Sequence, residues 1–337
     1  ASNNTAVGST ALTANTTGTQ NVAVGTNALD ANTTGGNNIA IGSNALTDNQ
    51  TTSNNVAIGV NALQDNTSSN NVAVGHSSQY ATNSGTRNTS IGYQTLSTNT
   101  SGSYNTALGA DALESATTAS NNTAVGYNSL TANTTGSSNT AVGSLCLDVN
   151  TTGDNNTAIG VRSLNSNTTG ASNTGLGLQA MRYNTTGDFN VAVGSGALRE
   201  NTTADNNTSV GYQALLLNTT GANNVALGAY SLDANTTGSH NTALGKSALG
   251  ANTTGTNLVA IGSGALDANT TGTHNVGIGQ DTLGVSTTGS RNTSVGANSL
   301  DANTTASDNT ALGYVALGAN TTGTRNTATG ALSLDLN

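Results

Sequence analysis

Residues 21–42 read N-V-A-V-G-T-N-A-L-D-A-N-T-T-G-G-N-N-I-A-I-G and contain the pattern that decides the fold. The segment V-A-V-G returns 17 residues later as I-A-I-G. The glycine that closes it, here called the anchor glycine, recurs at positions 8, 25, 42, 59, 75, 92, 109, 126, 143, 160, 177, 194, 211, 228, 245, 262, 279, 296, 313 and 330. Every step is 17 residues except that from 59 to 75, which is 16. This period predicts one repeat domain over residues 1–337, with about 20 coils.

Each copy places a short alternating segment before its anchor. The residue three before the anchor is β-branched in all 20 copies, and the residue one before it is aliphatic in 19. The residue between them is always Ala, Ser or Gly. Alternation with period two predicts a β-strand. We expect the β-branched and aliphatic side chains to face inward and the small one to face outward.

The residue four after the anchor is Leu in 18 of 20 copies, with Gln79 and Met181 as the exceptions. We expect this Leu to complete the interior of each coil. A 17-residue unit with an N-T-T-G turn leaves no stretch long enough for a stable helix. The sequence therefore predicts an all-β parallel β-solenoid, which at about 4.8 Å per coil would be roughly 90–95 Å long.

The recurrent glycines and asparagines are expected to be structural anchors. An invariant glycine at a corner indicates a positive backbone φ or the close approach of another backbone. A phosphate-binding loop would also need a following helix, for which the period leaves no room, and a lysine, which follows only one of the 20 anchors, as Lys246. Asn stands four before the anchor in 19 of 20 copies, where stacked amides can form a hydrogen-bonded ladder. Representative anchors are Gly8, Gly25, Gly42, Gly59, Gly126, Gly228, Gly313, Asn21, Asn55 and Asn190.

A second asparagine opens the N-T-T-G turn, as at Asn15, Asn32, Asn133 and Asn235. Its side chain can close an Asx turn before the glycine reverses the chain. The same letters form the N-x-S/T acceptor sequence for glycosylation. We favour the structural interpretation and keep glycosylation of these four residues as the alternative.

Composition excludes several classes of function. Seven Lys and Arg against 16 Asp and Glu give a net charge of −9, so no basic stripe is available for nucleic acid. One Cys and three scattered His predict neither an internal disulfide nor a metal site, and no cofactor motif is present. No apolar run is long enough for membrane insertion, and without an initiator Met or a signal pattern the chain is expected to be a segment of a longer fibre protein.

The remaining polar residues predict no catalytic residue. Asp233, Asp267, Asp301 and Asp335 occupy every second coil, five after the anchor, with glycine in the coils between. Calcium binding would need several carboxylates at one ion, and this spacing does not supply them. Arg199 and Glu200 would point to opposite faces of a strand. We therefore expect no enzyme, and we expect Cys146 to pack as a small apolar residue.

The segments N-N-I-A-I-G at 37–42 and N-N-V-A-I-G at 54–59 resemble the repeat of YadA-like heads in trimeric autotransporter adhesins. Ala62 and Ser129 stand where that family has its second small residue. The arrays are also similar to those in the shafts of phage tail fibres. The resemblance implies a left-handed β-roll, three chains around one axis and display for attachment. The coil here is longer than the adhesin coil by its N-T-T-G turn.

These observations favour a structural and adhesive fibre segment that is extracellular, on a cell surface or in a virion fibre. Its partners would be copies of itself, as a homotrimer or a filament, and a host-surface glycan or protein. A strip of small residues on the outer strand face would let copies approach closely. The exposed tyrosines, such as Tyr93 and Tyr314, are interpreted as scattered surface residues. The alternatives are an ice-binding solenoid using threonine pairs such as 16–17 and 236–237, and a matrix or sheath filament polymerised end to end.

Overall fold

The computed structural model describes residues 1–82 and 84–335, and all regular structure in these residues is β-strand. They include no helix with the length and apolarity that crossing a bilayer requires. The chain forms two compact units, Ala1–Thr169 and Gly170–Asn337. Within each unit the strands are parallel and recur at the 17-residue period, which confirms the predicted all-β parallel solenoid.

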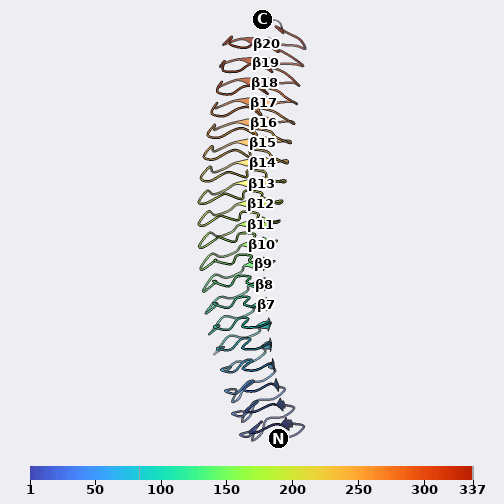
Figure 1. Ribbon diagram of the computed structural model, residues 1–337, viewed down its shortest axis with the longest axis vertical. Coiled ribbons are helices and arrows are strands. Elements are labelled where there is room, and N and C mark those ends of the chain that lie inside the picture. The colour runs from blue at the N-terminus through green and yellow to red at the C-terminus, as the bar shows by residue number, and fades with distance from the viewer. Residues whose placement is uncertain (83, 336–337) are drawn as a thin grey trace. The chain divides into compact units, whose positions relative to one another are not determined.

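The first unit contains the strands β1 to β10, each stacked on the one before it (Figure 1). Equivalent positions face one another, so that Ala23 lies opposite Ala40. The register is kept across the 16-residue step, where Ala57 lies opposite Ala73, because the missing residue is absorbed outside the strands. The strands are Thr5–Val7 (β1), Val22–Val24 (β2), Ile39–Ile41 (β3), Val56–Ile58 (β4), Val72–Val74 (β5), Thr89–Ile91 (β6), Thr106–Leu108 (β7), Thr123–Val125 (β8), Thr140–Val142 (β9) and Thr157–Ile159 (β10).

The second unit repeats this arrangement with β11 to β20, again in parallel register, as in the pairing of Ala226 with Ala243. The strands are Thr174–Leu176 (β11), Val191–Val193 (β12), Thr208–Val210 (β13), Val225–Leu227 (β14), Thr242–Leu244 (β15), Val259–Ile261 (β16), Val276–Ile278 (β17), Thr293–Val295 (β18), Thr310–Leu312 (β19) and Thr327–Thr329 (β20).

The strands are short because each is followed by a tight series of turns. In the second coil Gln20, Asn27 and Leu29 all have positive φ, at 60°, 56° and 54°. An L-residue in this left-handed conformation costs roughly 1–2 kcal/mol. Bonds between coils offset that cost, as where the Leu29 amide donates to the Ala45 carbonyl oxygen at 3.0 Å.

The predicted direction of the strand side chains is wrong. The central small residue faces inward, and Ala23, Ala107 and Ala243 are fully buried. The aliphatic residue before the anchor faces outward, so Ile41 is 38% and Leu108 is 45% exposed. The small strip is therefore no outer contact surface.

The narrow interior explains this reversal. A Cβ built on Gly277, which is the small residue of β17, would lie 3.2 Å from Leu266 Cδ1 and 3.1 Å from Thr282 Cγ2. The leucine of one coil thus fills the space facing the strand of the next, and only Ala, Ser or Gly fits opposite it. A larger aliphatic residue at that position would overpack the coil.

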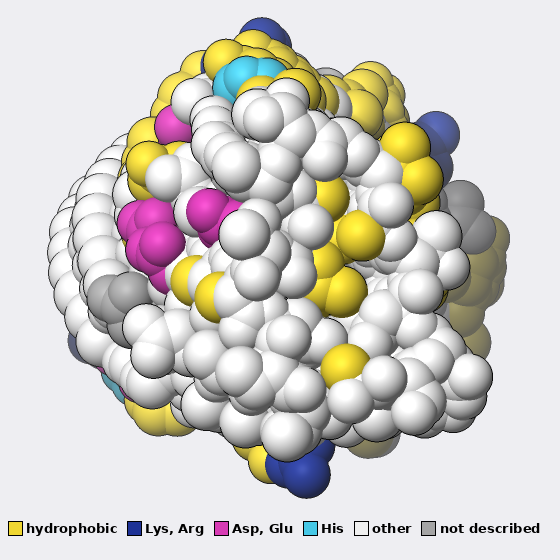
Figure 2. All heavy atoms as spheres, turned by 90° about the horizontal axis from the view of Figure 1, so that it is seen from below, with side chains coloured by type: hydrophobic (Ala, Val, Ile, Leu, Met, Phe, Trp, Pro, Cys, Tyr) yellow, Lys and Arg dark blue, Asp and Glu magenta, His cyan; other side chains and the backbone are white. Residues whose placement is uncertain are grey.

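The core therefore consists of the small strand residue, the residue three after the anchor and the leucine four after it. Side chains such as Ala28, Leu29 and Leu113 are fully buried, which confirms the predicted role of the leucine. Figure 2 shows hydrophobic side chains inside a ring of backbone and polar atoms. Cys146 is buried in this core, as expected. Gln79 is also fully buried, and its Nε2 has no hydrogen-bond partner among the described residues.

Candidate functional site

The anchor glycines hold neighbouring coils together. Gly25 has a φ of 132°, and a Cβ on it would lie 2.6 Å from the Gly42 carbonyl oxygen. Its amide donates to the carbonyl oxygen of Val7 in the preceding coil at 2.8 Å. Positive φ and close backbone approach are thus both present. The same geometry recurs at Gly8, Gly42, Gly59, Gly126, Gly228 and Gly313.

The asparagines before the strands form a buried ladder. The Oδ1 of Asn21 accepts the backbone amide of Asn38 at 2.9 Å, and its Nδ2 donates to the Gly35 carbonyl oxygen at 2.8 Å. Asn55 and Asn190 make the same two bonds, each to backbone groups of the coil that follows its own. Each amide therefore satisfies backbone groups of the following coil, which is a structural role.

The turn asparagines form a second ladder. Asn32 Nδ2 donates to Asn15 Oδ1 at 3.0 Å and to the Gly35 carbonyl oxygen at 3.1 Å. The side chains of Asn32, Asn133 and Asn235 are fully buried, whereas that of Asn15 is half-buried. A glycan on a buried Nδ2 would have to replace these bonds and enter the interior. The folded coils therefore support the Asx-turn interpretation over glycosylation.

The outer face of the strands, here called the sheet face, carries two columns of side chains. The residue one before the anchor is aliphatic in 19 of 20 copies, and the residue three before it is Thr in 12 copies and Val or Ile in the other eight. The sheet face consists of these two columns, and none of their residues is charged. The large side chains on it that are 37–48% exposed are Ile39, Ile41, Ile58, Ile91, Leu108 and Ile159 in the first unit and Val225, Leu227, Leu244, Ile278 and Leu312 in the second. A column of exposed aliphatic side chains without charged neighbours is typical of an interaction surface.

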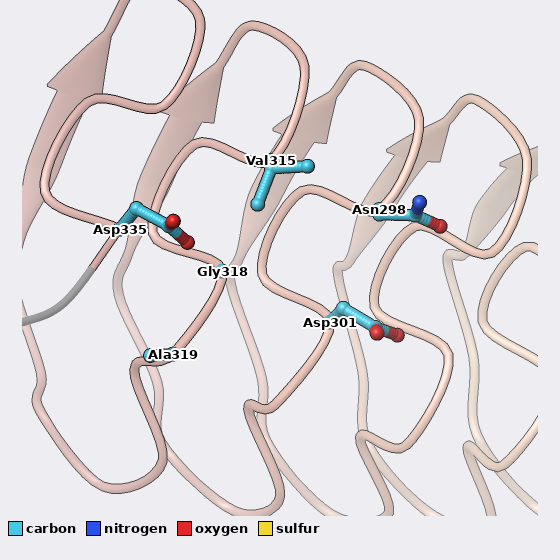
Figure 3. A pocket seen from close by; sticks show the side chains of 6 residues that line it. All are labelled: Asn298, Asp301, Val315, Gly318, Ala319 and Asp335. Atoms are coloured by element: carbon cyan, nitrogen blue, oxygen red, sulfur yellow. The ribbon is translucent and has the colours of Figure 1, made fainter.

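In the second unit a shallow groove of about 430 Å³ is lined by residues two, five and six after the anchor. Figure 3 shows Asp301 and Asp335 on alternate coils, with Gly318 on the coil between them. Partial burial raises the pKa of Asp233, Asp267 and Asp301. The described residues contain no group of three or more His, Cys, Asp or Glu side chains that could hold a metal ion.

The first unit has a hollow of about 450 Å³ at the equivalent place in the coil. It is lined by Ser77, Tyr80, Ala81, Gln94, Ser97 and Thr98. Close by, the His76 and Tyr93 rings stack with their centroids 5.6 Å apart. Sequence reasoning missed this place, although the 16-residue step and Gln79 pointed to it.

Arg199 and Glu200 form a local ion pair, and the Cys146 thiol is buried. Arg199 and Glu200 were expected to point to opposite faces, and this is wrong, because they lie in the turn after β12 and form an ion pair at 2.7 Å. Burial raises the pKa of the Cys146 thiol to about 12, so it is a poor nucleophile at neutral pH.

No protein-family model matches the chain, and no curated protein matches it either. The features of the chain that bear on its function are the sheet face, the groove and the stacking of the coils.

Proposed function

We propose that this chain is a structural and adhesive segment of an extracellular fibre, on a cell surface or in a virion, in which copies associate through the sheet face as a homotrimer. The observation that carries the proposal is the uncharged sheet face, whose aliphatic column recurs in 19 of the 20 copies. The resemblance to adhesin heads and tail-fibre shafts supports the same assembly, as a left-handed roll. Length, stiffness and surface attachment would be its contributions.

The sheet face calls for a partner because it lacks the charged side chains that keep solvated strands apart. Leu227 is 44% and Leu312 is 48% exposed in a chain whose charged residues are only 7% of the total. A second copy presents the same spacing from coil to coil, so the aliphatic columns of two copies can pack against each other within each unit. A partner without this period would match only part of it.

The test is the native mass of the full chain, measured by light scattering and native mass spectrometry. We expect three chains. The double variant Leu227→Glu/Leu312→Glu places isolated carboxylates on the sheet face and should give monomers with an unchanged circular dichroism spectrum. The matched control Thr237→Glu/Thr322→Glu changes exposed turn residues in the same two coils and should remain trimeric.

A monomeric wild-type chain, or a sheet-face variant that stays assembled, would refute the proposed association. An open-ended series of masses would instead favour the end-to-end filament.

The geometry gives less support to ice binding. In most N-T-T-G turns the hydroxyl of the first threonine donates to the next coil, as where Thr236 Oγ1 donates to the Thr253 carbonyl oxygen at 3.0 Å. The second threonine, such as Thr237, is exposed. One free column of hydroxyls per unit is a narrow surface for an ordered water lattice. Thermal hysteresis of the purified protein would decide in favour of this alternative.

A further inference from the structure

The hollow of the first unit combines an aromatic wall with neutral hydrogen-bonding groups. We propose that it binds the ring of a neutral pyranose sugar, alone or within a glycan chain. This inference rests on the adhesive part of the proposed function, because an attachment segment needs a ligand. It does not depend on trimer formation.

The aromatic wall is Tyr80, five residues after its anchor. It is the only aromatic residue at that position in any coil, and its neighbours in the adjoining coils are Gln64 and Ser97. The ring is half-buried, and its hydroxyl accepts a hydrogen bond from Gln64 Nε2 at 3.4 Å. The small side chain of Ser97 in the next coil leaves space beside the ring. A fixed aromatic surface next to a hollow suits the C–H face of a pyranose.

The polar groups around the ring are neutral. The side-chain amide of Gln94 has no hydrogen bond among the described residues, so it can both donate to and accept from sugar hydroxyls. Thr98 Oγ1 donates to the Glu114 carbonyl oxygen at 2.7 Å, which leaves its oxygen lone pairs free to accept. Ser77 Oγ lies 3.0 Å from His76 Nδ1.

The charges near the hollow select against anions. None of its six lining residues is charged. The nearest coils carry Asp65, whose amide bonds the Tyr80 carbonyl oxygen, and Asp111 and Glu114 on the other side. A phosphate or an acidic sugar would lie within a coil of these carboxylates, and no Lys or Arg is among the described residues that line the hollow. Because the hollow is shallow, we expect dissociation constants in the millimolar range for single sugars.

The test is saturation-transfer-difference NMR on the full chain with methyl glycosides of glucose, galactose, mannose and N-acetylglucosamine, and with glucuronate as the anionic probe. At least one neutral glycoside should receive saturation on its ring C–H protons, and glucuronate should not. Tyr80→Ser introduces the residue that the next coil carries at the same position. It should weaken binding by about tenfold. Gln94→Ala should also weaken it.

Tyr127→Ser is the matched control, because it removes an exposed tyrosine of the same unit outside the hollow. Its binding should equal that of the wild type. The inference is overturned if no neutral glycoside binds, if glucuronate binds as well as they do, or if Tyr80→Ser and Tyr127→Ser behave alike. An assembled trimer without sugar binding contradicts this inference alone, and a sugar-binding monomer contradicts the trimer alone.

Discussion

Two glycines in the second unit, Gly194 and Gly196, allow the stacking of coils to be tested with one kind of substitution. Gly194 is an anchor with a φ of 134°, and a Cβ on it would lie 2.7 Å from the carbonyl carbon of Gly211 in the next coil. Gly196 has a φ of 67°, and its Cβ would approach no atom closer than 3.4 Å. The equivalent position in the next coil holds Gln213, with a φ of 52°.

Gly194→Ala should be far more destabilising than Gly196→Ala. The anchor conformation is nearly restricted to glycine and costs an alanine about 1–3 kcal/mol. Relieving the overlap also means parting β12 from β13, which weakens two or three hydrogen bonds worth about 0.5–1.5 kcal/mol each. The total is roughly 2–7.5 kcal/mol, against about 1–2 kcal/mol for Ala in the left-handed region at position 196.

Chemical unfolding followed by circular dichroism measures the global effect, and hydrogen exchange locates it. Because solenoids can open locally, exchange should rise most in the peptides that contain β12 and β13. Equal losses of stability in the two variants would refute the role assigned to the anchor glycines. So would a Gly194→Ala protein whose exchange is unchanged around these strands.

Three further predictions follow from the core and the groove. Ala226→Val should destabilise the second unit by about 1–3 kcal/mol in chemical unfolding, whereas Val225→Ile on the outer face should have little effect. Cys146, with its pKa raised to about 12, should react with a thiol reagent only after denaturation, and labelling of the native protein would contradict its burial. Burial raises the pKa of Asp267 above 3.8, so it adds stability that is fully present below pH 3.8 and is lost as pH rises through the folded pKa. In Asp267→Asn the free energy of unfolding should depend less on pH in this range. If its pH dependence is the same as in the wild type, the Asp267 carboxyl is not its source.

Much of the fold could be predicted because each coil repeats the same strand, anchor glycine and buried leucine. The period gave the stacking, the invariant glycines marked the close backbone approach, and the leucine column marked the core. The inward and outward sides of the strand were assigned the wrong way round, because alternation defines two faces of a strand without saying which one is buried. How much the side-chain size varies at a position was the better signal for which face is buried. Position 23 and its equivalents are always small, whereas position 24 and its equivalents vary among Val, Ile, Leu and Thr.

The hollow was harder to predict. Tyr80 and Gln94 are 14 residues apart in the sequence and meet because the left-handed turns bring the residues two and five after the anchor to one side of the coil. Such adjacency depends on the path of the turn, which composition and spacing do not specify. The departures from the repeat at this place were the sequence signals: the 16-residue step, Gln79, and Tyr80 as the one aromatic residue five after an anchor.

The in-register pairing of equivalent residues has a consequence for how such a gene can change. Unequal recombination that adds or deletes one complete coil leaves every remaining residue with neighbours of the same type, so length can vary without new packing. A shift by one residue is tolerated only in a loop, as between Asn66 and Asn70. Related genes should therefore differ chiefly in their number of whole repeats, and their novel ligand contacts should arise at single coils.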